Sequence, residues 1–123
     1  MEIKKWEDGE LFEANGGHMY WVFWPGNESN GVTLHYTYLL PGESFNLHNH
    51  DYSEDIITVI KGEGKVLTDK EELDIEEGMS LRAKAREFHG FKNTGEEPMV
   101  LIGSQAPADL NIYKKGGYTF IKK

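Results

Sequence analysis

The stretch PGESFNLHNHDYSEDIITVIKG (residues 41–62) decides the fold and holds the densest group of potential metal ligands in the chain. Two histidines, His48 and His50, stand one residue apart, and adjacent acids follow at Glu54 and Asp55. A Pro-Gly turn opens the stretch, and an apolar run ending in glycine closes it. Imidazole and carboxylate groups at this spacing are typical ligands of first-row divalent metals. Their joint use depends on the fold around them.

Short apolar runs recur along the whole chain and are bounded by Gly, Pro, Asn or Asp, which is typical of strands joined by turns. They are rich in β-branched and aromatic residues and occupy residues 18–24, 32–40, 55–60, 64–69, 79–83, 87–91, 99–103 and 118–121. The acidic segment 71–77 alternates Leu73 and Ile75 with charge, as a half-exposed strand does. Helix is minimal, with a turn or two expected at 108–115. The pattern predicts an antiparallel all-β barrel or sandwich.

Length and composition bound the function. The 123 residues fit one domain, 1–123, with a sizeable core, and the absence of cysteine excludes thiolate metal sites and cysteine nucleophiles. A net charge of -8 argues against nucleic-acid binding. No apolar stretch approaches the length of a membrane helix, and residues 1–15 do not resemble a signal peptide. We therefore expect a cytoplasmic protein without a membrane or nucleic-acid partner.

The run Met19–Trp24 is apolar on both parities, whereas a strand with one wet face would alternate. Both faces of this strand are therefore expected to be covered. The cover is either a second layer of the same chain or a partner subunit. We expect a homodimer in which this strand lies at the interface between the two subunits.

Strand periodicity constrains which side chains in the opening stretch can meet. On a regular strand His48 and His50 project to the same side. Adjacent acids on a strand point to opposite sides, so Asp55 faces the interior if Ile57 does. If a bulge shifts the strand, Glu54 takes the place of Asp55 as the acid that joins the histidines. An HxH pair alone is weak evidence for a metal site, because histidines in strands are more often ordinary polar residues.

Two spaced motifs give the chain a resemblance to the cupin family of small β-barrels. The family motifs are G-x5-H-x-H-x3,4-E-x6-G and G-x5-P-x-G-x2-H-x3-N. The first is matched by Gly42, His48, His50, Asp55 and Gly62, and the second by Gly78, His89 and Asn93. The resemblance spans about residues 32–105; segments 1–31 and 106–123 are expected to pack on this core or on a partner.

The resemblance implies an antiparallel double-stranded β-helix, or jelly-roll barrel, with one divalent transition metal inside it. Its ligands would be His48, His50, Asp55 and His89, a set suited to Mn, Fe, Co, Ni or Zn rather than to Mg or Ca. The chain departs from the family in two places. Asp55 replaces the usual glutamate, and Lys84-Ala85-Arg86 replaces P-x-G, so no Pro or Gly presets that turn.

A small polar molecule is expected to bind in the barrel. Its candidate pocket residues are His35, Tyr36, Tyr38, Arg82 and Phe91. Arg82 could clamp a substrate carboxylate, or could instead lie on an outward basic face. Asn93 is expected to stabilise a turn rather than bind metal.

Three functions follow from these expectations. The first is a metal-dependent enzyme, with a dioxygenase or another oxidoreductase ahead of an isomerase or lyase. The second is a non-catalytic cupin that binds a sugar or organic acid. The third is a structural metal clip. The fold does not select among them.

Overall fold

The structure is a computed structural model that describes residues 1–14, 17–29, 31–109 and 118–121. It confirms the prediction of an almost entirely β chain. Within these residues the helical elements are two short 3-10 turns, η1 (Trp6–Asp8) and η2 (Pro25–Asn27). None of the helices in the described part is long and apolar enough to cross a membrane.

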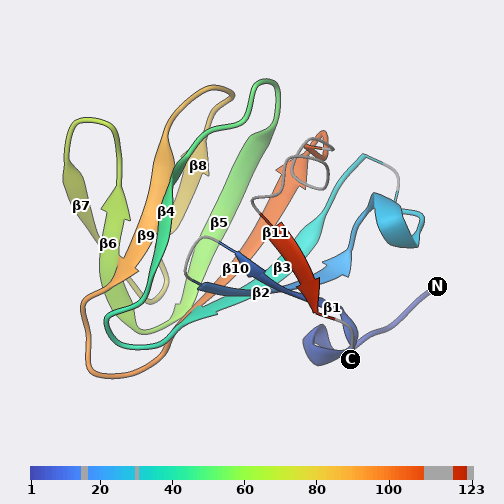
Figure 1. The fold of residues 1–123 in the computed structure, drawn as a ribbon, viewed down its shortest axis with the longest axis horizontal. Coiled ribbons are helices and arrows are strands. Elements are labelled where there is room, and N and C mark those ends of the chain that lie inside the picture. The colour runs from blue at the N-terminus through green and yellow to red at the C-terminus, as the bar shows by residue number, and fades with distance from the viewer. Residues whose placement is uncertain (15–16, 30, 110–117, 122–123) are drawn as a thin grey trace.

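The strands form two antiparallel sheets that face each other as a jelly roll (Figure 1). The larger sheet has seven described strands in the order β11-β1-β2-β3-β10-β5-β8. Their bounds are β1 (Glu10–Ala14), β2 (Gly17–Phe23), β3 (Leu34–Leu39), β5 (Glu54–Lys61), β8 (Ser80–Ala83), β10 (Met99–Ala106) and β11 (Tyr118–Ile121). The smaller sheet runs β4-β9-β6-β7, with β4 (Ser44–His48), β6 (Glu63–Leu67), β7 (Glu72–Glu76) and β9 (His89–Asn93).

The core lies between the two sheets and is built by alternation along the strands. On β5, Asp55, Ile57 and Val59 are buried, while Ile56 and Ile60 are exposed. The apolar core cluster comprises Leu39, Phe45, Ile57, Val59, Val66, Ile75, Phe91, Met99 and Leu101. Because Asp55 shares the parity of this core, its carboxylate is carried into the interior.

Glycines of the two sequence motifs end strands in conformations that glycine adopts at little cost. Gly42, Gly62 and Gly78 have φ of 85°, 88° and 88°. At Gly62 a Cβ would also lie 2.9 Å from the carbonyl oxygen of Pro98. Each of these turns reverses the chain between two strands, which explains why the motifs place glycine at fixed distances from the histidines.

The runs predicted as strands are strands in the structure, but two strands were not among the predicted runs. Glu10–Ala14 is short and half polar, and it becomes β1 by pairing with β2 and β11. Ser44–His48 is also polar and becomes β4 by pairing with β9. Pairing to neighbours thus overrides weak local propensity. Most of the helical turn predicted at 108–115 lies outside the described residues.

The two-sided apolar strand β2 receives part of its cover from its own chain. Trp21 and Val22 are buried. On the outer side, the ring of Trp6 in η1 stands edge-on to Tyr20 at 5.0 Å and stacks on Tyr36 at 4.0 Å between centroids. The N-terminal turn therefore covers part of the face that a partner was expected to cover, and the homodimer stays a prediction.

Candidate metal centre

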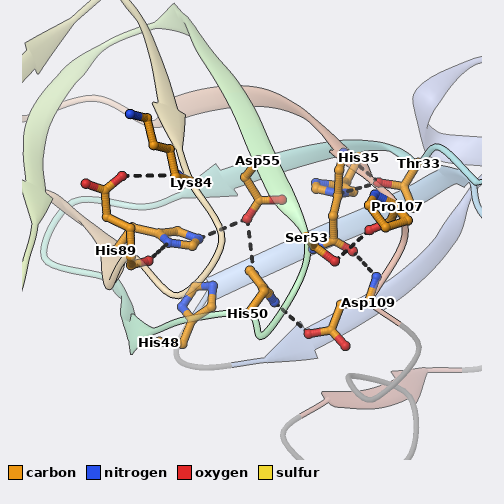
Figure 2. A network of polar contacts seen from close by, with 12 residues as sticks. Thr33, His35, His48, His50, Ser53, Asp55, Lys84, His89, Pro107 and Asp109 are labelled. Atoms are coloured by element: carbon orange, nitrogen blue, oxygen red, sulfur yellow. Dashed lines mark hydrogen bonds and ion pairs between the residues drawn. The ribbon is translucent and has the colours of Figure 1, made fainter.

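Four side chains from three strands and one loop meet at one end of the barrel. They are His48 at the end of β4, His50 in the loop that follows, Asp55 on β5 and His89 at the start of β9. One potential ligand atom from each lies within 4.8 Å of all the others. Figure 2 shows the four side chains turned toward a common point. The structure therefore brings together the four residues that the cupin resemblance implies.

A bulge in β4, rather than simple alternation, directs His48 into the barrel. Phe45 pairs with Phe91 and His48 pairs with His89, so the register shifts by one residue between the two pairs. Phe45 and His48 consequently both line the interior. The prediction that His48 and His50 share one regular strand is wrong, because β4 ends at His48 and His50 is placed by the loop.

The carboxylate of Asp55 lies at the centre of the cluster. Its Oδ2 is 2.9 Å from Nε2 of His89 and 3.1 Å from Nε2 of His50. Its Oδ1 is buried and has no hydrogen-bond partner. A buried carboxylate oxygen without a partner carries a desolvation cost, and a cation bound to the carboxylate would offset that cost.

The imidazoles are oriented by hydrogen bonds on their far side. Nδ1 of His48 donates to the carbonyl oxygen of Asn46 at 2.8 Å, and Nδ1 of His89 donates to that of Glu87 at 2.9 Å. Nδ1 of His50 donates to Oδ2 of Asp109 at 2.8 Å. These acceptors carry no hydrogen, so each Nδ1 holds a proton and each Nε2 is left with its lone pair for the cluster.

This arrangement places acceptors against acceptors. The Nε2 lone pairs of His50 and His89 face Oδ2 of Asp55, and two acceptors at hydrogen-bond distance require a cation between them, either a proton or a metal ion. Three imidazole nitrogens and one carboxylate match the ligand preferences of Mn, Fe, Co, Ni and Zn. The residues therefore fit a divalent transition metal.

Burial and neighbouring charges act in opposite directions on the ionisation of the cluster. Burial alone would raise the pKa of Asp55, but the imidazoles of His50 and His89 that face its carboxylate hold that pKa below its usual range. Burial, reinforced by the neighbouring His89, lowers the pKa of His48 to about 4. Burial opposes the charged form of His50, but Asp55 and Asp109 outweigh it and raise the pKa of His50. The site thus combines an ionised carboxylate with a neutral imidazole at His48.

Asp109 is a site residue that the sequence did not indicate. It is buried, and its backbone N–H donates to Oε1 of Gln105 at 2.6 Å. The same segment is fastened by Ser53, whose hydroxyl donates to the carbonyl oxygen of Pro107 at 2.6 Å (Figure 2). Asp109 lies outside both motifs and no periodicity relates it to His50, so only the path of the chain after β10 reveals the contact.

A small cavity of about 40 Å³ adjoins the four residues. His35 and Phe91 line it, as predicted for pocket residues, together with Phe45 and Gln105. Nε2 of His35 lies 2.9 Å from the hydroxyl of Thr33, and burial lowers the pKa of His35 to about 4. The described lining is mostly apolar and includes no lysine or arginine, so charge at this end of the barrel comes from the cluster itself.

Three of the predicted pocket residues lie elsewhere. Tyr36 and Tyr38 alternate with buried His35 and Thr37 on β3, so they face the outside of the sheet and do not line the cavity. Arg82 is also outside, where its Nε lies 3.4 Å from Oε1 of Glu54. Glu54 thus points away from the cluster that contains Asp55, and the choice of Asp55 as the metal ligand stays a prediction.

Asn93 has the structural role expected of it. Its side-chain amide donates to the carbonyl oxygens of Leu39 and Glu97, both at 2.8 Å, and its Oδ1 accepts from the N–H of Gly95 at 2.9 Å. With these groups occupied, Asn93 holds the turn after β9 and stays away from the cluster.

Comparison with known proteins identifies relatives of this architecture. The family model described as "Cupin domain" matches residues 35–104. No curated protein matches the sequence significantly.

Solved structures share the fold over most of the chain. A Thermotoga maritima protein described as a predicted oxalate decarboxylase has a TM-score of 0.77 at 18% identity, covering 87% of this chain and 100% of its own. Ectoine synthase from P. lautus has a TM-score of 0.75 at 16% identity, covering 99% and 91%. A Thermus thermophilus protein has a TM-score of 0.70 at 28% identity, covering 87% and 98%.

Proposed function

The chain belongs to the cupin family, and from that premise we propose that it is a metal-dependent enzyme acting on a small polar molecule. The proposal is carried by one observation. Three Nε2 lone pairs and the carboxylate of Asp55 converge inside the barrel, and the buried Oδ1 of Asp55 lacks a partner. A divalent transition metal, such as Mn, Fe, Co, Ni or Zn, would be held by His48, His50, Asp55 and His89.

Such an ion would supply Lewis acidity, and Fe or Mn would also supply redox chemistry. The chain contributes the rest. Backbone carbonyls at Asn46 and Glu87 and the carboxylate of Asp109 fix the tautomers and the directions of the imidazoles. Phe45 and Phe91 keep the adjoining cavity apolar, which strengthens electrostatic interactions at the cluster.

Within the enzyme class we propose a dioxygenase or another oxidoreductase. The described cavity lining includes no serine or lysine, and its one hydroxyl is that of Thr37; we therefore assign the chemistry to the metal. The relatives' names include a decarboxylase and a synthase, and their identities with this chain are too low to carry either reaction over. An isomerase or lyase, or a non-catalytic binder of a sugar or organic acid, is therefore the alternative.

Metal content and turnover test the proposal together. Protein purified without added metal or a chelating tag should contain about one transition-metal ion per chain by elemental analysis. His50→Ala should lose that ion and all turnover in a substrate screen run with and without air. His18→Ala is the matched control, because His18 pairs with Glu43 away from the cluster.

Each outcome separates the hypotheses. Turnover that persists in metal-free His50→Ala refutes a metal-dependent enzyme. Tight retention of a small molecule without turnover under any metal favours the non-catalytic binder. A protein that never acquires a metal ion contradicts both the enzyme and the structural metal clip.

A further inference from the structure

A second hollow reaches the metal centre from outside the barrel. It is a groove of about 740 Å³ between β7 and β8, which are the terminal strands of the two sheets at this side. Apolar side chains such as Val66, Ile75 and Leu81 line it. His89 lines both this groove and the small cavity beside the cluster. The inner end of the groove therefore borders His89, whose buried imidazole faces Asp55.

Arg86 lines this groove in a backbone conformation that favours glycine. Its φ is 68°, in the left-handed region that disfavours residues with a Cβ. The position is the one at which the family motif has glycine. The backbone of Arg86 is tied to the HxH loop, since its N–H donates to the carbonyl oxygen of His50 at 2.6 Å and its carbonyl accepts from the amide of Asn49 at 3.2 Å.

Left-handed backbone alone does not mark a site. Glu28 also has a positive φ, at the end of η2, where it merely terminates a turn. Arg86 differs because its side chain lines a groove that ends at His89, and because its backbone is bonded to His50. The backbone bond to His50 thus fixes a residue with a cationic side chain at the wall of the groove.

The charges around the groove leave this guanidinium available. Arg82 pairs with Glu54, and the carboxylate of Asp74 is occupied by Lys65. Glu87 accepts a hydrogen bond from the backbone N–H of Lys84. No ion pair to Arg86 occurs among the residues that the structure describes. The other charged residues lining the groove are Asp69, Lys70 and Glu71.

We propose that Arg86 binds the carboxylate of a small anionic molecule whose other end reaches the metal centre beside His89. A guanidinium binds a carboxylate through two parallel hydrogen bonds, which gives orientation as well as affinity. The cavity lining supplies no cation, so the groove provides the charge that the barrel interior lacks. The inference rests on the proposed function and narrows its ligand to carboxylic acids with a second metal-binding group.

Dicarboxylates of increasing length test this proposal. One carboxylate can bind the metal, the carbon chain can extend along the groove, and the second carboxylate can then bind Arg86. Metal-loaded protein is titrated calorimetrically with acetate, succinate, glutarate and adipate. We expect at least one dicarboxylate to bind the wild type about ten-fold or more tighter than acetate. Arg86→Gln should abolish that advantage, and Arg86→Lys should restore part of it. Lys84→Gln is the matched control, since it removes one charge two residues away and outside the groove lining.

The outcomes are distinct. An equal dicarboxylate advantage in wild type and Arg86→Gln, or an equal loss in Lys84→Gln, overturns the assignment of Arg86. So does a wild type that does not prefer any dicarboxylate over acetate. Metal content is measured on each sample. Failure of the wild type to hold metal refutes the proposed function, whereas normal metal content with unchanged selectivity refutes only the role of Arg86.

Discussion

Nδ1 of His50 lies 2.8 Å from Oδ2 of Asp109, although 59 residues separate the two in the chain. The contact joins the loop after β4 to the segment after β10, and both side chains are buried. A carboxylate behind a ligating imidazole fixes its tautomer and increases its basicity. We therefore propose that Asp109, from a segment outside the part that matches the family model, positions the imidazole of His50 for the proposed metal ion.

Asp109→Asn should weaken metal binding without preventing folding. The amide keeps the shape but loses the charge, and outer-shell changes of this kind cost about 10–100-fold in metal affinity. Competition titration with a chromophoric chelator measures the loss. In the cobalt-substituted protein the visible absorption bands should also shift, which a purely structural residue would not cause. Asp51→Asn is the control, because Asp51 is exposed beside His50; equal losses in the two variants would contradict the role of Asp109.

Asp55→Asn and Glu54→Gln form a matched pair that tests which acid binds the metal. Asp55 is buried against two imidazoles, whereas Glu54 pairs with Arg82 on the outside. Replacing Asp55 removes the one anionic ligand, so the metal dissociation constant should rise about ten-fold or more. Glu54→Gln should leave it unchanged within two-fold, as roughly expected for an exposed pair. The reverse order of effects in the same chelator titration would exclude Asp55.

His35 should make the metal-free protein less stable as the pH falls. Burial lowers its pKa from 6.5 to about 4 in the folded chain, so between these values the unfolded chain binds more protons. The stabilising contribution is present above pH 6.5 and is lost as the pH falls toward 4, at most roughly 3 kcal/mol. Urea unfolding of chelator-treated protein measures this.

His35→Gln should show a shallower loss over that pH range than the wild type. The wild type and the variant are compared directly because His50 also affects the pH dependence of the free energy of unfolding. Its pKa is raised, so its contribution has the opposite sign to that of His35. Identical pH slopes for the wild type and His35→Gln would show that His35 does not titrate in this window.

The homodimer predicted through the strand at Met19–Trp24 stays a prediction, and we propose a second candidate interface for it on the outer face of the larger sheet at β5 and β10. Ile56 and Ile60 on β5 are 52% and 44% exposed there, beside half-buried Val100 and Ile102 on β10. Exposed apolar side chains on adjacent strands favour burial against a second copy. Sedimentation at micromolar concentration should give a dimer, and Ile56→Glu should give a monomer. Thr68→Glu, in the turn between β6 and β7, is the control; a monomeric wild type would end the proposal.

The sequence by itself determined the fold class and the identity of the four clustered residues. The spacing from His50 and Gly62 in the first motif selects Asp55 over Glu54, and strand alternation adds only that the two acids face opposite sides. Motif glycines such as Gly62 could be recognised in the sequence as turn positions, because a positive φ there favours glycine over other residue types. These are local properties, which neighbouring residues decide.

Only the tertiary structure decided how the cluster is assembled. The bulge that turns His48 inward depends on the register of β4 against β9, and the support of His50 by Asp109 depends on the path of the chain after β10. Tyr36 and Tyr38 could not be placed because alternation gives two faces without saying which is inner. Contacts between distant segments carry no local signal, and they are what make four separate side chains one site.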